Sequence, residues 1–181
     1  MPTTVQELQL LERVRSGDRR AADELVLATY RPIFAALARL CGGDRELAAD
    51  LTQETFRRAW QGLAQFDGRS RASTWLYRIA YNAFLNHVRR PVRAVPIDEE
   101  TAVADPALDI EQRLAAAESL RLLRDAVLAL PDGLRFIVTA RYWAELSVRD
   151  IAREQGVSTV AIRKRLRRAL ACLEEAMEKQ S

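Results

Sequence analysis

The chain has 181 residues, of which 49% are apolar, so it can bury the core of one domain or of two small domains. Its formal net charge is only +3, so a role in binding nucleic acid must depend on where the charges lie. The single histidine, His87, excludes a histidine metal cluster and makes a Ser-His-Asp triad hard to assemble, and the sequence has no glycine-rich phosphate loop. We therefore expect no enzymatic activity, no metal and no cofactor.

Two features of the sequence bear on its compartment. The amino-terminal residues carry charges where a signal peptide would have its apolar core, and no run approaches the roughly 18 apolar residues of a membrane span. Cys41 and Cys172 have no zinc-site spacing and are most simply reduced thiols. We therefore expect a cytoplasmic protein.

Apolar residues recur with helical spacing almost throughout, and no segment alternates as a strand would, so the predicted fold class is all-α. One clear helix follows Asp44, which can cap it, and Gly62 marks its end. Its predicted apolar arc consists of Ala48, Leu51, Phe56, Ala59, Trp60 and Leu63. The opposite arc is polar, and either it is solvated or it contacts a partner; it carries Asp50, Gln53, Glu54, Arg57 and Gln61.

A loop is predicted from Phe66 to Arg71, and Ser73 or Thr74 can cap a further helix that ends at Arg90, before a proline. The predicted buried stripe of this helix is Leu76, Ile79, Ala80 and Ala83. Its predicted outward side carries Trp75, Arg78, Tyr81, Asn82, Asn86 and Arg89. Proteins that bind single-stranded nucleic acid combine basic, amide and aromatic groups in this way, although a solvated face with a few packed aromatic rings has the same composition.

Residues 91–112 differ in composition from the rest of the chain. They hold three prolines and six acidic residues against one basic residue, whereas residues 1–90 and 113–181 each have an excess of basic residues. A segment of this composition stays extended. We predict an acidic flexible linker between two compact helical domains, 1–90 and 113–181, and the linker either is a passive tether or has a role of its own.

The second domain contains the spacing of a helix-turn-helix at Ala152, Gly156 and Ile162, and Ser158 can cap the second helix of this motif. The predicted buried side of that helix is Ile162, Leu166, Ala169, Leu170 and Leu173. Its predicted outward side is Val160, Ala161, Lys164, Arg167 and Arg168, with Arg163 at the edge. A helix that exposes this much positive charge is suited to anchoring phosphates and entering a major groove, so DNA binding is favoured over a merely solvated face.

Four segments in order along the chain resemble the extracytoplasmic function (ECF) group of bacterial sigma factors. LERVRSGDRRAADELV is similar to the opening helices of the family, and DLTQETFRRAW to its polymerase-docking helix. FDGRSRASTWLYRIAYNAFLNHVRR resembles its minus-ten segment, and LPDGLRFIVTARYWAELSVRDIAREQGVSTVAIRKRLRRAL its minus-thirty-five domain. The resemblance implies a sigma region 2 domain at 1–90, a linker at 91–112 and a sigma region 4 helix-turn-helix domain at 113–181.

The resemblance also implies partners and site residues. The partners are core RNA polymerase, promoter DNA and an anti-sigma factor, the last being the family's usual control. The residues implied in polymerase binding are Asp50, Gln53, Glu54 and Arg57. Those implied at the minus-ten element are Asp67, Gly68, Arg69 and Ser70, as a loop that receives a flipped base, together with Arg78, Asn82, Asn86 and Arg89. Those implied at the minus-thirty-five element are Ser158, Thr159, Ala161, Arg163, Lys164, Arg165, Arg167 and Arg168.

The chain departs from the family at Gln155, where an apolar residue is usual, so the turn of the helix-turn-helix is expected to pack less well. In the family the linker enters the catalytic channel of the polymerase, and six acidic residues fit a path otherwise taken by nucleic acid. The alternative interpretation is a helix-turn-helix regulator whose amino-terminal helices sense a signal, and a remote one is an enzyme with an unrecognised helical site. The sequence indicates neither the promoter, the regulon, the inducing signal nor the class of the anti-sigma factor.

Overall fold

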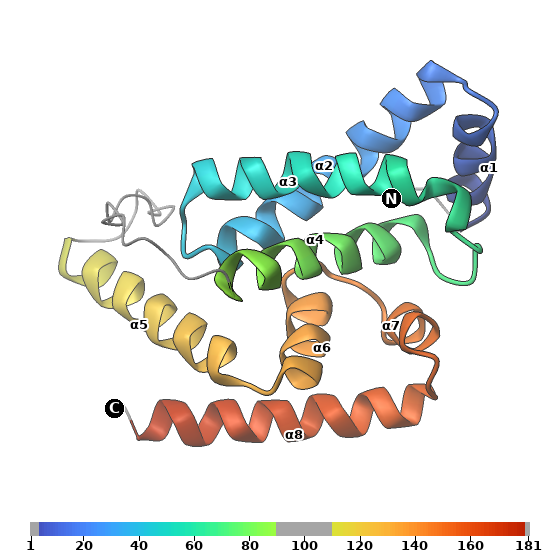
Figure 1. The fold of residues 1–181 in the computed structure, drawn as a ribbon. Coiled ribbons are helices and arrows are strands. Elements are labelled where there is room, and N and C mark those ends of the chain that lie inside the picture. Colours follow the sequence, from blue (N-terminus) through green and yellow to red (C-terminus); the bar gives the residue numbers. More distant parts are fainter. Residues whose placement is uncertain (1–3, 90–109, 180–181) are drawn as a thin grey trace.

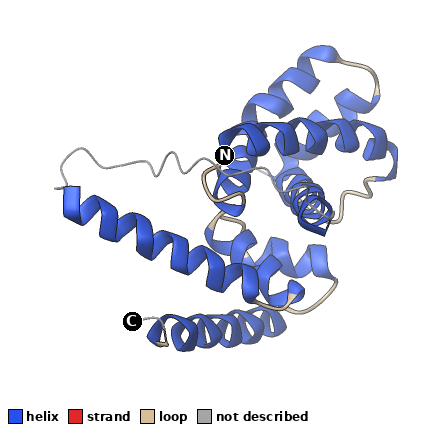
Figure 2. Cartoon of the chain, turned by 60° about the vertical axis from the view of Figure 1, so that its left-hand side comes forward, coloured by secondary structure: helices blue, strands red, loops and turns tan. Residues whose placement is uncertain are grey.

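The computed structural model describes residues 4–89 and 110–179, and within these ranges every regular element is a helix (Figure 2). The all-α prediction is therefore confirmed. The amino-terminal group of helices is α1 (Thr4–Arg15), α2 (Arg19–Leu40), α3 (Arg45–Gly62), the short 3-10 helix η1 (Leu63–Gln65) and α4 (Ala72–Arg89). The carboxy-terminal group is α5 (Ile110–Ala129), α6 (Asp132–Tyr142), α7 (Val148–Gln155) and α8 (Thr159–Glu178). Of the predicted linker, all but 110–112 lies outside the described residues.

In the amino-terminal group, α2, α3 and α4 pack against one another, and α1 lies against α2 at one end (Figure 1). Asp44 caps α3 as predicted, since its side chain accepts a hydrogen bond of 2.9 Å from the backbone nitrogen of Leu47. The predicted apolar arc of α3 is wrong at Trp60, which is 38% exposed. Thr52 and Thr55 are buried instead, because each hydroxyl donates to a carbonyl one turn earlier at 2.6 Å and so needs no other partner.

Helix α4 begins at Ala72, so the predicted capping role of Ser73 or Thr74 is wrong. The backbone nitrogens of Thr74 and Trp75 donate to the carbonyl of Arg71 at 3.1 and 3.0 Å, which places both candidate caps inside the first turn. Trp75 and Tyr81 were predicted to face outward, and this is also wrong. Trp75 is half-buried, with its ring 4.9 Å from that of Phe66.

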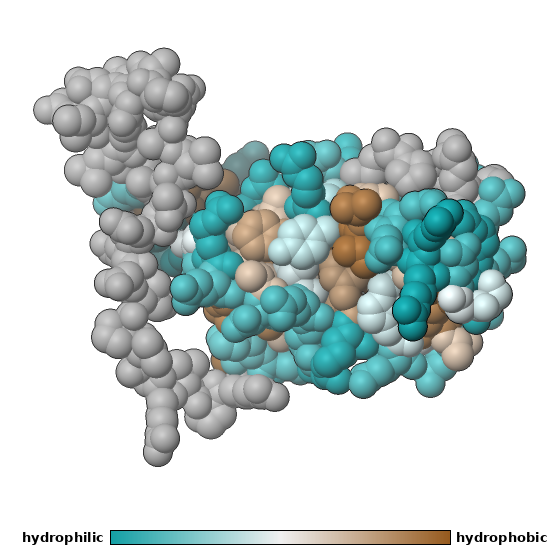
Figure 3. Space-filling model, turned by 90° about the horizontal axis from the view of Figure 1, so that it is seen from above, coloured by the Kyte–Doolittle hydropathy of each residue, from teal (hydrophilic) through white to brown (hydrophobic). Residues whose placement is uncertain are grey.

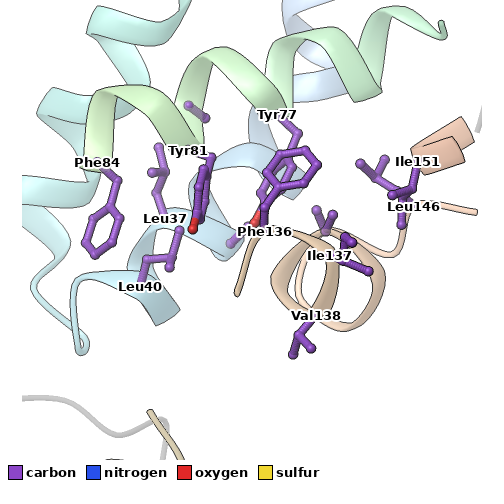
Figure 4. Close-up of a cluster of buried hydrophobic side chains, with 14 of the residues drawn as sticks. Leu37, Leu40, Tyr77, Tyr81, Phe84, Phe136, Ile137, Val138, Leu146 and Ile151 are labelled. Atoms are coloured by element: carbon purple, nitrogen blue, oxygen red, sulfur yellow. The ribbon is translucent and has the colours of Figure 1, made fainter. Parts of the chain in front are cut away.

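Tyr81 is only 3% exposed because a helix of the carboxy-terminal group covers it. Figure 4 shows Tyr77 and Tyr81 of α4 beside Phe136 of α6, and the ring centroids lie 5.8 and 5.2 Å from that of Phe136. Burial raises the pKa of Tyr81 to about 12. The two groups of helices therefore share one buried apolar cluster. Tyr81, which a helical wheel of α4 places on the outward side, lies at the contact between the two groups.

The helix-turn-helix consists of α7 and α8, as predicted. Gly156 ends α7 with φ +64°, a left-handed conformation that favours glycine, and the nitrogen of Val157 donates to the carbonyl of Ala152 at 3.0 Å. The hydroxyl of Ser158 accepts from the nitrogen of Ala161 at 3.1 Å and so caps α8. The turn is thus closed by hydrogen bonds on both sides, next to a half-buried Gln155.

The buried side of α8 consists of Ile162, Leu166, Ala169 and Leu173. The prediction that Leu170 is also buried is wrong, because this side chain is 36% exposed. The four buried residues follow each other at spacings of three and four, and they contact α5, α6 and α7 as one narrow stripe. Leu170 lies at the edge of that stripe.

Candidate nucleic-acid and protein interfaces

The outward face of α8 carries a dense group of cations. Arg163, Lys164, Arg165, Arg167 and Arg168 are all exposed, and none of them forms an ion pair with any residue that the structure describes. Val160 is 69% exposed at the start of the same helix, while Thr159 and Ala161 are half-buried. A run of cations without internal counterions attracts a polyanion.

The predicted polar face of α3 is present, but its residues differ in what they contact. Glu54 accepts hydrogen bonds of 2.6 Å from Arg57 and from Arg58, and these bonds lower the pKa of Glu54 to about 2. Asp50, one turn earlier, and Gln53, the residue before Glu54, are exposed and have no hydrogen-bond partner among the described side chains. Counting only pairs between described residues, the one unpaired carboxylate of this face, that of Asp50, therefore lies at its amino-terminal side, next to the neutral amide of Gln53.

An exposed apolar strip lies beside the polar face of α3, and the sequence analysis missed it. It consists of Leu27, which is 78% exposed, and Tyr30 on α2, together with Trp60 on α3. The ring of Tyr30 stacks on Phe34 and Phe56, with centroids 6.0 and 6.3 Å apart. Figure 3 looks onto the side of the molecule that is uppermost in Figure 1, where apolar surface lies inside a hydrophilic rim. Exposed apolar patches of this kind mark contact surfaces. A helical wheel of α2 would have indicated this one, because Leu27 and Tyr30 lie three positions apart on one face.

The predicted base-receiving loop is only partly open to a ligand. Asp67 and Arg69 are exposed, and the carboxylate of Asp67 accepts a hydrogen bond of 3.0 Å from the nitrogen of Arg69. Gly68 has φ +72°, a left-handed conformation that favours glycine at this point of the loop. Ser70, in the same loop, is buried, so this member of the predicted set does not face solvent in the structure.

A hollow of about 370 Å³ lies between the end of α3 and the outer side of α4. It contains one predicted minus-ten residue, the exposed Asn82, and its other lining residues are Arg58, Gly62, Gln65, Trp75 and Ile79. Asn86 is exposed one turn further along α4. An indole, a guanidinium and two amides around one hollow are groups that stack on and hydrogen-bond to a nucleobase. Sequence patterns could not find it, because its walls come from three separate elements, α3, η1 and α4.

Two predicted minus-ten cations contact the carboxy-terminal group. Arg78 donates to the carboxylate of Glu154 on α7 at 3.0 Å, and Arg89 donates to the carboxylate of Asp132 at the start of α6 at 2.8 Å. The hydroxyl of Tyr81 donates to the carbonyl of Asp132 at 3.3 Å. The outward face of α4 is therefore divided, since Asn82 and Asn86 are exposed while Arg78 and Arg89 are paired with carboxylates from the other group of helices.

Further observations concern thiols, metals and membranes. Both cysteines are free thiols, and burial raises the pKa of Cys41 to about 12. Within 4–89 and 110–179 we find no cluster of three or more potential metal ligands. Over the same stretches, none of the helices has the length and apolar character that crossing a bilayer requires.

Both groups of helices match known protein families. Residues 13–94 match the family model described as Sigma-70 region 2, and residues 120–173 match the one described as Sigma-70, region 4. The first match spans α2, α3 and α4 and the second spans the helix-turn-helix, so the surfaces described above lie within the two regions. A fold with both regions in this order defines the chain as a sigma factor, a class of transcription initiation factor.

The chain belongs to the ECF group of RNA polymerase sigma factors. It is 35% identical to the RNA polymerase sigma-H factor of Pseudomonas aeruginosa, over 98% of this chain and 97% of that protein. It is 28% identical to the ECF sigma-E factor of Haemophilus influenzae, over 93% and 94% of the two chains. The solved structure of CnrH in complex with the cytosolic domain of CnrY is similar over 97% of this chain and 99% of CnrH, with a TM-score of 0.69 and 25% identity.

Proposed function

We propose that this sigma factor binds core RNA polymerase and directs promoter-specific initiation by recognising a minus-ten and a minus-thirty-five element. The observation that carries this proposal is the row of five exposed cations on α8, held by a closed helix-turn-helix turn. Residues 1–90 are the region 2 domain, 91–112 the linker and 113–181 the region 4 domain. The protein acts in the cytoplasm and catalyses no reaction itself. An anti-sigma factor controls its access to polymerase; in support, the similar protein CnrH was solved in complex with another protein, the cytosolic domain of CnrY.

The test is a promoter selection with purified components. The full chain is combined with core RNA polymerase and a randomised promoter library, and templates that yield transcripts are sequenced. If the chain acts as a sigma factor, the templates that yield transcripts share two separate sequence elements, and these templates are enriched only when polymerase is present. The alternative, a regulator that binds DNA as a dimer, predicts instead a palindromic site that the chain retains in the absence of polymerase, and that result would overturn the proposal.

The minus-ten element is opened and held by α4, the hollow beside it and the loop at 67–70. Trp75 presents a ring on which an unpaired base can stack, and Asn82 presents an amide for the base edge or the backbone. Flipping a base costs a few kcal/mol of stacking and pairing, which such contacts offset. The polymerase-binding face is Asp50, Gln53, Glu54 and Arg57 on α3, and the exposed strip of Leu27, Tyr30 and Trp60 extends it.

The double variant Asn82→Ala with Asn86→Ala is expected to form fewer open complexes on a selected promoter, while its affinity for core polymerase stays unchanged. Two lost hydrogen bonds to the strand predict a reduction of roughly tenfold or more. Permanganate reactivity of unpaired thymines measures the opening. Loop variants at 67–70 are expected to be partly rescued by a promoter whose minus-ten region is already unpaired, and without rescue the loop has only a structural role.

Alanine variants at Lys164 and Arg168 separate base reading from phosphate anchoring. Both side chains are exposed on one face of α8, and Lys164 lies nearer to the capped end that enters the groove. We expect Lys164→Ala to lose roughly 1 to 3 kcal/mol of binding free energy on the selected minus-thirty-five sequence and to relax the base preference at one position of that sequence. We expect Arg168→Ala to weaken binding to all DNA sequences alike. It should also reduce, by about one, the slope of log affinity against log salt concentration. If both variants bind selected and scrambled DNA as the parent does, this face does not contact DNA.

The contact between α4 and α6 cannot persist on a promoter. Elements at minus ten and minus thirty-five are about 25 base pairs apart, or roughly 85 Å along the helix axis at about 3.4 Å per pair. In the structure Tyr81 and Phe136 have ring centroids only 5.2 Å apart, and Arg78 and Arg89 are bound by Glu154 and Asp132. The 20 residues of 90–109, between the end of α4 and the start of α5, could span about 66 Å if extended, so the chain permits the domains to separate.

A further inference from the structure

Both ends of the loop at 66–71 are fastened to α1. At one end, the guanidinium group of Arg15 donates to the carbonyl of Leu63, at 3.2 Å from Nε and 3.1 Å from Nη2, and also to the carbonyl of Phe66. At the other end, Arg71 donates to the carboxylate of Glu7 at 2.5 Å. These contacts connect residues 48 to 64 positions apart in the chain, so they define where the loop lies relative to the rest of the domain.

We propose that Arg15 and Glu7 are positioning residues for minus-ten recognition, and that α1 holds the loop in the conformation that receives the unpaired base. The inference rests on the proposed function of this loop. It adds two residues that touch neither DNA nor polymerase in that proposal. Glu7 lies before residue 13, where the match to Sigma-70 region 2 begins, and the sequence analysis gave α1 no role.

Of the two fastening contacts, the one between Arg71 and Glu7 is shielded from water, whereas Arg15 is exposed and is held by three hydrogen bonds to backbone carbonyls. Glu7 is only 2% exposed and Arg71 is half-buried, and a buried charge is stable only when it is paired. The hydrogen bond to Glu7 raises the pKa of Arg71 above its ordinary value. Underneath the loop is a separate apolar cluster, in which α1 and α2 pack against the two loop ends; its buried members are Leu11, Leu25, Leu63, Phe66 and Ala72. Removing either charged partner therefore releases one end of the loop without emptying this cluster.

Between its fastened ends the loop is already shaped. Gly68 is in the left-handed conformation, and the carboxylate of Asp67 binds both the backbone nitrogen of Arg69, at 3.0 Å, and its side chain, at 3.1 Å. A loop that is ordered before it binds loses less conformational entropy on binding. Holding its ends fixed is what keeps the tip, with Asp67 and Arg69 exposed, in one place.

The first experiment measures hydrogen exchange of the full chain and needs no promoter. Arg15→Ala and Glu7→Gln are expected to raise amide exchange in residues 67–71 by roughly tenfold, because each removes a charged hydrogen bond that fixes one end. The matched control is Arg13→Ala, which removes an arginine from the same helix whose ion pair, with Asp18 at 2.7 Å, lies on the exposed side of α1. Exchange that stays at the level of the control in both variants would overturn the inference.

The second experiment measures open complexes of the full chain with core polymerase on the promoter chosen by selection. Arg15→Ala is expected to reduce opening about tenfold with unchanged polymerase affinity, and Arg15→Lys, which keeps one donor, to recover part of it. In a chain that already carries Asp67→Ala and Arg69→Ala, the further change Arg15→Ala should have little effect, because it acts through the loop.

The outcomes separate the inference from the function on which it rests. Additive losses in the combined variant, or loss of opening by loop variants without loss in Arg15→Ala, would refute positioning by α1 and leave the loop's role intact. If the loop variants themselves open promoters normally, the proposed role of the loop fails, and positioning fails with it, even where exchange rises.

Discussion

Replacing Asp50 by arginine is expected to abolish binding to core RNA polymerase while leaving the fold intact. Asp50 is exposed on α3, and in the part of the chain that the structure describes it forms no ion pair. Glu54, one turn further on, already binds Arg57 and Arg58, so Asp50 is the carboxylate of this face that remains available to a partner. A reversed charge at an interface costs several kcal/mol, whereas an exposed substitution changes the free energy of unfolding by about 0.5 kcal/mol or less.

Pull-down of core polymerase by tagged full chain measures the effect, and thermal melting followed by circular dichroism measures stability. The matched control is Glu12→Arg, which makes the same charge change at an exposed position on α1, away from the α2 and α3 surface. Loss of binding by Asp50→Arg alone, with both variants melting as the parent does, supports the α3 face. A fall in helicity that accompanies the loss of binding would mean that the residue maintains the fold.

The features that sequence reasoning predicted correctly depend on residues close together in the chain. The Asp44 and Ser158 caps and the left-handed Gly156 are each defined by hydrogen bonds within five residues, so local patterns suffice to find them. The helix-turn-helix was predictable for this reason, and its basic face needed only the helical period. The linker bound is less exact, because residues 110–112 were predicted to be extended and instead form the first turn of α5.

The features that sequence reasoning missed depend on which helix lies opposite. Tyr81 has the polar surroundings of an outward residue on α4, yet Phe136, 55 positions later, covers it. Arg78 is paired with Glu154 across 76 positions, and no pattern along the chain indicates such a contact. The same holds for the hollow beside Asn82 and for the fastening of the loop by α1. Local periodicity gives each helix a buried side, but the edges of that side are decided by the neighbouring helix.

Phe136→Ala is expected to separate the two groups of helices. Phe136 is 5% exposed, and its ring contacts Tyr77 and Tyr81 of α4 (Figure 4), so its removal empties the centre of the contact. Truncating a buried phenylalanine costs about 3 to 5 kcal/mol. The surrounding ion pairs of Arg78 and Arg89 involve partly exposed side chains and contribute little by comparison. The packing free energy lost with Phe136 is therefore larger than the free energy that these ion pairs contribute. The equilibrium between packed and separated domains shifts toward separated domains.

Separation also frees the cations that the contact occupies. Once Glu154 and Asp132 move away, Arg78 and Arg89 lie exposed beside Asn82 and Asn86, and the whole outward face of α4 becomes available to phosphates. We therefore expect Phe136→Ala to have a larger radius of gyration by small-angle scattering and to bind a single-stranded minus-ten oligonucleotide more tightly. The gain should fall as salt rises, because the freed contacts are ionic.

Val138→Ala is the matched control for this variant, because Val138 is also buried on α6 but points away from α4 (Figure 4). It should lower the melting temperature without changing the radius of gyration or the affinity for the single strand, since the cavity forms inside the carboxy-terminal group. If Phe136→Ala only melts earlier, as this control does, the contact with α4 does not limit access to the minus-ten face. If Phe136→Ala expands without binding the strand more tightly, Arg78 and Arg89 are not strand contacts, and the minus-ten surface is confined to the hollow, the asparagines and the loop.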